Sequence, residues 1–342
     1  MTDVRGIDDA RVSAWLASEI PDAVGPFTFE LIAGGRSNLT YRVTGSDGTE
    51  LVLRRPPLGH VLATAHDMAR EHKIITGVGL TDVPVAPALG LCTDESVNGA
   101  PFYVMGYVDG LVLDSPAAGE AIPVENRTRA AESLIDVLVR LHAVEPDDVG
   151  LGDLGKRADY LGRQLRRWSI QWEQSKTREL PEMEQLAALL ASRKPDQVHT
   201  GIVHGDYRLG NCLVSRTTGQ VSAVLDWELC TLGDLMADVG YILVYYSDPG
   251  SSWRRENDPS GSDGFPTRAS LLARYATATG RDLGGVGYYE AFSCWRLACI
   301  GEGVLARYRA GVMGDDGVDM SAMVDGTKLL AQRALEALES IA

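Results

Sequence analysis

The chain has 342 residues, a hydrophobic content of 45% and a formal net charge of -15. This length predicts two or three packed units, and the composition excludes a disordered, collagen-like or coiled-coil chain. The acidic balance argues against nucleic-acid or anionic-membrane binding by the chain as a whole.

Cysteine usage and the N-terminus indicate where the protein works. The five cysteines are odd in number and never spaced as CxxC, so neither a disulfide framework nor a structural zinc site is indicated. The N-terminus lacks a basic and apolar leader, and no apolar run approaches the length of a membrane span. We therefore expect a cytoplasmic protein without membrane contact; the number of subunits has no signal in the sequence.

The first hundred residues predict a small sheet with helices beside it. Asp8 can cap a first helix that Pro21 ends. From Phe27 the apolar period changes to two, which predicts a three-stranded meander. A helix over 64–75 follows the meander. The expected strands are 27–33, 39–44, 49–54, 86–92 and 101–108.

Beyond Gly110 the pattern becomes mainly helical, beginning with apolar residues at helical spacing over 126–144. The exceptions are two strand-like segments, 211–215 and 221–225, and a polar stretch over 249–268 that reads as a long loop and a candidate lid. We therefore predict an α+β protein with two lobes. Residues 1–106 form a sheet-rich lobe, and residues 107–342 form a larger helical lobe.

The densest group of reactive side chains lies in HGDYRLGN, from His204, and in LDWE. If the two strand-like segments pair as a hairpin, Asn211 lies opposite Leu225 and therefore meets Asp226, with Asp206 close by. Two carboxylates and an amide suit Mg²⁺, which proteins hold together with substrate phosphates. This layout predicts phosphoryl transfer, with a base and two metal ligands sharing one phosphate.

The small lobe supplies a cation for the same chemistry. Arg54 shares a strand face with Val52, where a guanidinium can meet nucleotide phosphates. In the next helix, Glu71 falls on the apolar stripe and therefore needs a buried partner. Arg54 is the natural partner, because a carboxylate would fix its guanidinium beside the phosphates, and Arg55 is the competitor.

The turn 34–38, GGRSN, joins the first two strands. Its backbone N–H groups could lie over phosphates, with Ser37 and Asn38 adding side-chain bonds. A Gly-Gly turn in a hairpin is more often merely a turn, and the spacing is not GxGxxG.

Together these motifs resemble the aminoglycoside phosphotransferase and choline kinase superfamily, whose members share the two-lobed protein-kinase-like fold. The resemblance implies that Asp206 is the catalytic base and that Asn211 and Asp226 hold Mg²⁺. The ATP site that it implies comprises Gly35, Ser37, Asn38, Arg54, Glu71, Met105 and Tyr107. The supporting residues that it implies around the catalytic loop are His204, Asp234 and Asp238.

Four further segments, LRRPPLGH, AHDMAREH, GAPFYVM and CWRLACIGEGVLARY, are similar to the kinase-like domains fused to acyl-CoA dehydrogenases. That subgroup implies a small-molecule hydroxyl acceptor such as a hydroxyacyl-CoA rather than an antibiotic. The chain departs from the superfamily pattern at Arg54, where a lysine is expected, and at Gly106, where the hinge often carries an acid. Arginine binds phosphate oxygens in a planar fork, so phosphate binding with altered geometry is expected.

Acceptor selection should fall to the helical lobe, where arginines and tryptophans gather in two stretches. The candidate residues are Arg167, Trp168, Trp295 and Arg296. The competing interpretation places the arginines on solvated helix faces and the tryptophans in the core.

Two other functions stay open from the sequence. An aminoglycoside-type antibiotic kinase suits the acidic surface, which attracts cations. A nucleotide-binding regulatory module without phosphotransfer is motivated by Arg54. A protein kinase fits less well because no APE-type segment follows LDWE, and a metal hydrolase fits least because no HExxH is present.

Overall fold

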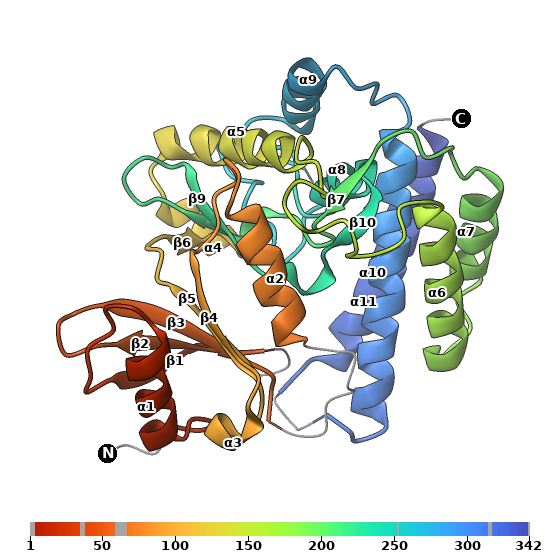
Figure 1. Ribbon diagram of the computed structural model, residues 1–342. Coiled ribbons are helices and arrows are strands. Elements are labelled where there is room, and N and C mark those ends of the chain that lie inside the picture. The colour runs from red at the N-terminus through yellow and green to blue at the C-terminus, as the bar shows by residue number, and fades with distance from the viewer. Residues whose placement is uncertain (1–3, 35–37, 59–66, 252, 314–316, 341–342) are drawn as a thin grey trace.

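The computed structural model describes residues 4–34, 38–58, 67–251, 253–313 and 317–340. Figure 1 shows two lobes: a small one built on a sheet, in red to orange, and a larger, mainly helical one, in yellow to blue. The predicted α+β, two-lobed, kinase-like fold is confirmed. No helix within these ranges combines the length and apolar character needed to cross a membrane.

The small lobe is built on one antiparallel sheet in the order β1-β2-β3-β5-β4. Its strands are β1 (Thr28–Ala33), β2 (Leu39–Thr44), β3 (Glu50–Arg55), β4 (Ala88–Cys92) and β5 (Phe102–Gly106). All five were expected, β1 to β3 from the period of two and β4 and β5 as strand-like runs. The sheet ends at Gly106, and the next strand, β6 (Leu111–Val112), pairs with a strand of the larger lobe.

Helices cover both faces of this sheet. On one face lies α1 (Asp9–Glu19), whose cap Asp8 accepts a bond from the Arg11 amide and whose Leu16 packs with Leu53 and Phe102. Short α3 (Glu95–Asn98) lies beside it. On the other face, α2 (Met68–Val78) contributes its apolar side to a core that continues through the larger lobe. Because α2 belongs to that core, it links the two lobes (Figure 1).

The larger lobe consists of helices around two small sheets. Its helices are α4 (Pro116–Ala121), α5 (Val124–Leu141), α6 (Tyr160–Ser175), α7 (Pro181–Ser192), α8 (Met236–Val244), α9 (Arg268–Thr279), α10 (Val286–Arg309) and α11 (Met320–Glu339). One sheet pairs β7 (Thr200–Val203) with β10 (Thr231–Asp234), a pair that the sequence reading missed. The other has the order β6-β8-β9.

The predicted hairpin is present as β8 (Cys212–Val214) and β9 (Val221–Val224). The Leu225 amide donates to the Asn211 carbonyl at 2.8 Å, so these two residues face each other as the register predicted. The hairpin therefore brings the end of the HGDYRLGN segment to the start of LDWE.

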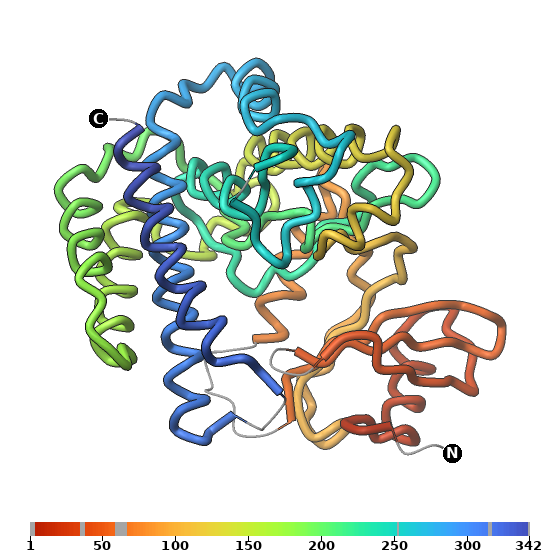
Figure 2. Tube along the Cα trace, turned by 180° about the vertical axis from the view of Figure 1, so that it is seen from behind, coloured from red at the N-terminus to blue at the C-terminus, as the bar shows by residue number. Residues whose placement is uncertain are grey.

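The polar stretch that follows α8 is a loop, as expected, and it is anchored from within. Asp258 is fully buried and accepts hydrogen bonds from Ser247 and from the amide and hydroxyl of Ser260. In Figure 2 this stretch, coloured cyan to blue, lies on the face of the larger lobe turned toward the viewer. A lid function for it stays a prediction.

Candidate active site

Asp206 lies in the loop between β7 and the short 3-10 helix η1 (Leu209–Asn211). The Asn211 amide nitrogen donates to the Asp206 carboxylate at 2.7 Å and to its carbonyl at 2.8 Å. The Tyr241 side chain, from α8, also adjoins the Asp206 carboxylate. With 21% of its side chain exposed, Asp206 is fixed on two sides and still open to a substrate.

The buried carboxylate of Asp238, in α8, holds the backbone of this loop in place. Its carboxylate accepts the amides of His204 and Gly205 at 2.7 and 2.8 Å, and it is fully buried. His204 in turn contacts the Leu225 carbonyl through its ring at 2.9 Å. Burial would raise the pKa of Asp238, but the hydrogen bonds from His142 and the Gly205 amide outweigh it and lower that pKa. A stable carboxylate therefore fixes the backbone that carries Asp206.

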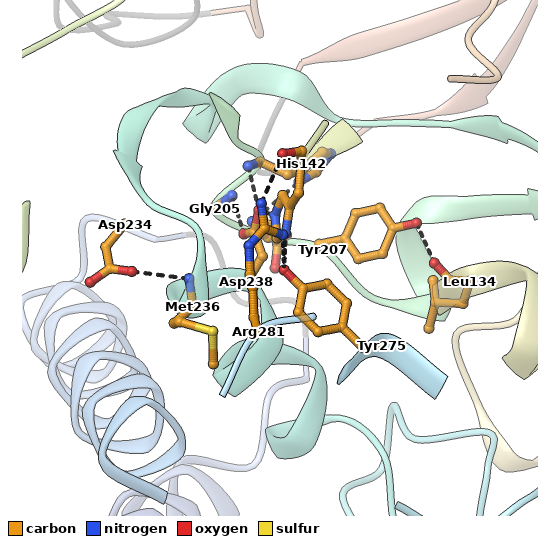
Figure 3. A network of polar contacts seen from close by, with 11 residues as sticks. Leu134, His142, Gly205, Tyr207, Asp234, Met236, Asp238, Tyr275 and Arg281 are labelled. Atoms are coloured by element: carbon orange, nitrogen blue, oxygen red, sulfur yellow. Dashed lines mark hydrogen bonds and ion pairs between the residues drawn. The ribbon is translucent and has the colours of Figure 1, made fainter. Parts of the chain in front are cut away.

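A buried polar network extends from Asp238 to α9. His142, at the end of α5, faces Asp238 at 3.4 Å and Tyr275 at 2.7 Å, and Arg281 donates to the Tyr275 hydroxyl at 2.8 Å. Figure 3 shows these side chains gathered beside Gly205. Burial lowers the pKa of His142 although Asp238 opposes the shift. Asp234 lies apart, where it accepts the Tyr289 hydroxyl and the Met236 amide and fixes the start of α8.

The residues present fit a magnesium ion. Asn211 uses its amide nitrogen on Asp206, which leaves its carbonyl oxygen as a ligand. Asp226, next to it at the end of the hairpin, has a left-handed backbone with φ of 61°, which turns the chain sharply after β9. In the described part of the chain, no group of three or more His, Cys, Asp or Glu is arranged to hold a metal ion alone, so further ligands would come from phosphates and water.

Arg54 connects the small lobe to Asp226. Its Nε lies 3.0 Å from Glu71 and its Nη2 lies 2.6 Å from Asp226. Burial alone would lower the pKa of Arg54, but the charge of Glu71, with Tyr103 and Asp226, outweighs it and raises that pKa. A permanently charged guanidinium therefore spans the two lobes at the site where phosphates would lie.

The predicted partnership of Arg54 and Glu71 is present, and the competitor is elsewhere. Arg55 points to the other sheet face, where it donates to the carbonyls of Gly6 and Asn98. Glu71 is 2% exposed and also accepts from Asn38 and Tyr103, at 2.8 and 3.1 Å. Asn38 therefore supports the ion pair directly.

Of the other residues predicted to bind the nucleotide, the structure describes only some. Gly35 and Ser37 lie outside the described residues. Met105 pairs with Val52 in the sheet, and the Tyr107 amide donates to the Glu50 carbonyl at 3.3 Å. The Tyr107 amide is thus already used within the protein, and adenine contact at this hinge stays a prediction.

The four predicted acceptor residues do not meet at the catalytic loop. Trp295 is 1% exposed and belongs to the core. Arg296 is 6% exposed, donates to the Gly205 carbonyl at 2.5 Å and lies over the Tyr241 ring, so it supports the loop from beneath. On α6, exposed Arg167 stacks on Trp168 with 5.2 Å between the guanidinium carbon and the ring centre.

Sequence reasoning did not single out two residues of the site. Tyr241 adjoins Asp206 and follows Asp238 by three residues, so its position on the same helix face was the available signal. Glu228 follows Asp226 in the short helix η2 (Trp227–Leu229). Burial, with the charges of Asp226 and Glu71, raises the pKa of Glu228 to about 7. Its place in LDWE was visible, but its burial was not.

A protein-family model described as "Phosphotransferase enzyme family" (APH) matches residues 28–286. The chain belongs to this family. The match runs from β1 to the start of α10 and contains Arg54, Asp206 and Asp226, whereas Tyr289 and Arg296 of α10 lie beyond it.

The chain is also similar in sequence to individual curated proteins. The chain is 36% identical over 294 residues to acyl-CoA dehydrogenase family member 10 of Mus musculus, covering 84% of this chain and 27% of that protein. It spans 27% to 43% of the length of the curated relatives that it matches. These relatives include acyl-CoA dehydrogenase family member 11 of several vertebrates, as the subgroup resemblance implied.

Solved structures agree with the fold. A putative aminoglycoside phosphotransferase from Ralstonia eutropha has a TM-score of 0.83 and 32% identity, covering 97% of this chain and 98% of that one. An aminoglycoside phosphotransferase in ternary complex with ADP and hygromycin B has a TM-score of 0.64 and 12% identity, covering 98% and 99%. At that identity the second shows the fold alone.

Proposed function

We propose that this protein is an ATP- and Mg²⁺-dependent phosphotransferase that moves the γ-phosphate to a hydroxyl of a small molecule. The observation that carries the proposal is the arrangement of Arg54, which reaches Glu71 in one lobe and Asp226 in the other. Asp206 and Asn211 adjoin Asp226 across the hairpin end. A base, a metal-binding pair and a fixed cation together suit phosphoryl transfer.

Each residue has a distinct part in this chemistry. Asp206, oriented by Asn211 and Tyr241, accepts the hydroxyl proton and aims the oxygen at the phosphorus. Arg54 binds the α- and β-phosphates and is held in place by Glu71. Asn211 and Asp226 would hold Mg²⁺, which when bound neutralises charge on the phosphates.

For the acceptor, we propose a hydroxyacyl-CoA or a similar hydroxylated metabolite. The proposal rests on the likeness to proteins named acyl-CoA dehydrogenase family members. The antibiotic kinases remain the competing acceptor class, because the ternary complex with hygromycin B has the same fold.

The test is acceptor-dependent ADP release from Mg²⁺-ATP with a panel of hydroxyacyl-CoAs, aminoglycosides and small sugar or amino alcohols. The Asp206→Ala variant should lose turnover by at least about 1,000-fold while binding ATP nearly as well, because the carboxylate acts on the acceptor. Turnover by wild type alone supports the proposal and identifies the acceptor class. ATP binding without turnover across the panel would favour a regulatory module, and equal activity of Asp206→Ala would refute the base.

A further inference from the structure

Two arginines beside the catalytic loop have no part in the chemistry proposed above. Arg208 follows Asp206 by two residues, and Arg255 comes from the loop that follows α8. Their guanidinium carbons lie 4.9 and 4.7 Å from the ring centre of the same residue, Tyr245, which is 8% exposed. One nearly buried ring thus positions two guanidinium groups, and that of Arg208 lies 3.7 Å from the Asp206 carboxylate.

The guanidinium of Arg208 has hydrogen-bond donors that no described residue uses. Its Nε lies 3.7 Å from the Asp206 carboxylate, which is longer than a hydrogen bond. Its Nε and Nη1 are buried and have no hydrogen-bond partner among the described residues. Buried donors are normally hydrogen-bonded, so a guanidinium with two unused donors that still exposes 18% of its side chain indicates a place for a ligand.

The backbone leaves room for Arg208. A Cβ at Gly210 would lie 2.0 Å from Nη1 of Arg208, so a side chain at that position would displace the guanidinium. Gly210 therefore permits the loop to hold both Asp206 and Arg208 within one turn.

Arg255 is positioned by the anchored loop. Asp258, three residues later, is fully buried in bonds to Ser247 and Ser260. The one side-chain hydrogen bond described for Arg255 is a long contact of 3.4 Å to Asn257. The second guanidinium therefore also keeps donors available while its backbone is held.

Resting on the proposed phosphotransfer, we propose that Arg208 together with Arg255 binds an anionic oxygen group, a carboxylate or a phosphate, on the acceptor. Guanidinium groups bind such oxygens in a planar fork, and Arg208 lies near enough to Asp206 for one small molecule to contact both. The acceptor hydroxyl and its anionic group are then only a few atoms apart or joined by a flexible chain. Cationic aminoglycosides are disfavoured, despite the acidic surface of the whole chain.

Binding is measured by calorimetry in Mg²⁺-ADP, without turnover. The probes are 3-hydroxybutyrate and 4-hydroxypentanoate, each against its neutral amide, and 3-hydroxybutyryl-CoA against the pantetheine thioester, which lacks the phosphates and the adenosine of CoA. Wild type should bind the anionic member at least about tenfold more tightly in one of these comparisons. Preference within the acid pairs identifies a carboxylate, and preference within the thioester pair identifies a phosphate.

Arg208→Gln and Arg255→Gln should each reduce this preference about tenfold or more and leave binding of the neutral member unchanged. Arg129→Gln, at an exposed arginine of α5, removes the same charge and should keep the preference. ATP and ADP affinities are measured for all three variants. Loss of ATP affinity with intact acceptor preference would assign Arg208 to the nucleotide and overturn the proposal.

The two proposals fail in different ways. The anion site is overturned if the wild-type protein binds each acid as well as its amide and the CoA thioester as well as the pantetheine thioester. This holds even if the protein phosphorylates a neutral alcohol. A protein that prefers the anion but never releases ADP would refute phosphotransfer and leave the anion site standing.

Discussion

At the scale of single residues, the arginine in place of the expected lysine is a fitted part of the site. Arg54 uses two different nitrogens, one for Glu71 and one for Asp226. A lysine has one nitrogen on a flexible stem and cannot keep both contacts in the same fork. These two contacts favour the interpretation that Arg54 is adapted to this site.

This assignment predicts the effect of Arg54→Lys. We expect kcat/KM for ATP to fall about 10- to 100-fold, because one charge-assisted hydrogen bond contributes about 1.5–3 kcal/mol. Steady-state kinetics with the acceptor found in the panel measures this change, and Arg42→Lys, at the Glu50 pair of the small lobe, is the control. Faster turnover of Arg54→Lys would instead mark the site as degraded.

The spacing of neighbouring residues in the sequence predicted the positions of some site residues but not of others. Helical periodicity placed Glu71 on the buried side, and hairpin register placed Asn211 opposite Leu225. Arg296 supports the catalytic loop from α10, across 91 residues of sequence, and no local pattern separates that role from acceptor binding. Tertiary contacts between distant helices decide such roles, and one sequence does not contain them.

At the scale of elements, the anchored loop after α8 should connect stability to acceptor binding. Asp258→Ala would leave the buried Ser260 amide without its acceptor, at about 1–3 kcal/mol, and would remove one of the two acceptors described for each serine hydroxyl. We expect a lower melting temperature and a higher KM for the acceptor, since Arg255 would lose its support, with KM for ATP unchanged. Differential scanning fluorimetry and kinetics measure both effects.

The matched control is Asp263→Ala, an exposed carboxylate in the same loop. It should change neither quantity. If Asp258→Ala lowers the melting temperature but leaves acceptor KM at the wild-type value, the loop is a structural anchor only.

Elements with strong periodicity were predicted well, and short ones were not. The first three strands of the small lobe follow a period of two between clear turns, and the other two are short apolar runs, so their pattern was visible. Strands β7 and β10 have four residues each and pair with each other across nearly thirty intervening positions. A strand of four residues without an adjacent turn is too short to show a hydrophobic period in the sequence.

At the scale of the whole molecule, stability should depend on pH through the network under the catalytic loop. His142 is buried between Asp238 and Tyr275, and burial lowers its pKa in the folded protein. The unfolded chain keeps an ordinary histidine pKa of about 6.5, so it binds more protons than the folded protein below that pH. Acidification therefore favours unfolding, and stability from this residue is lost as pH falls below about 6.5.

The variant His142→Gln isolates the contribution of this histidine to the pH dependence of stability. At pH 7.5 the variant loses bonds within the network, and we expect it to be less stable by about 1–3 kcal/mol. At pH 5.5 the deficit should shrink, because wild type now bears the cost of its buried histidine and the variant does not. Urea unfolding of both proteins at the two pH values, with His199→Gln outside the network as control, measures the difference. A deficit that stays constant or grows on acidification would mean that Asp238 keeps His142 charged in the fold, and the catalytic loop would then rest on a buried ion pair.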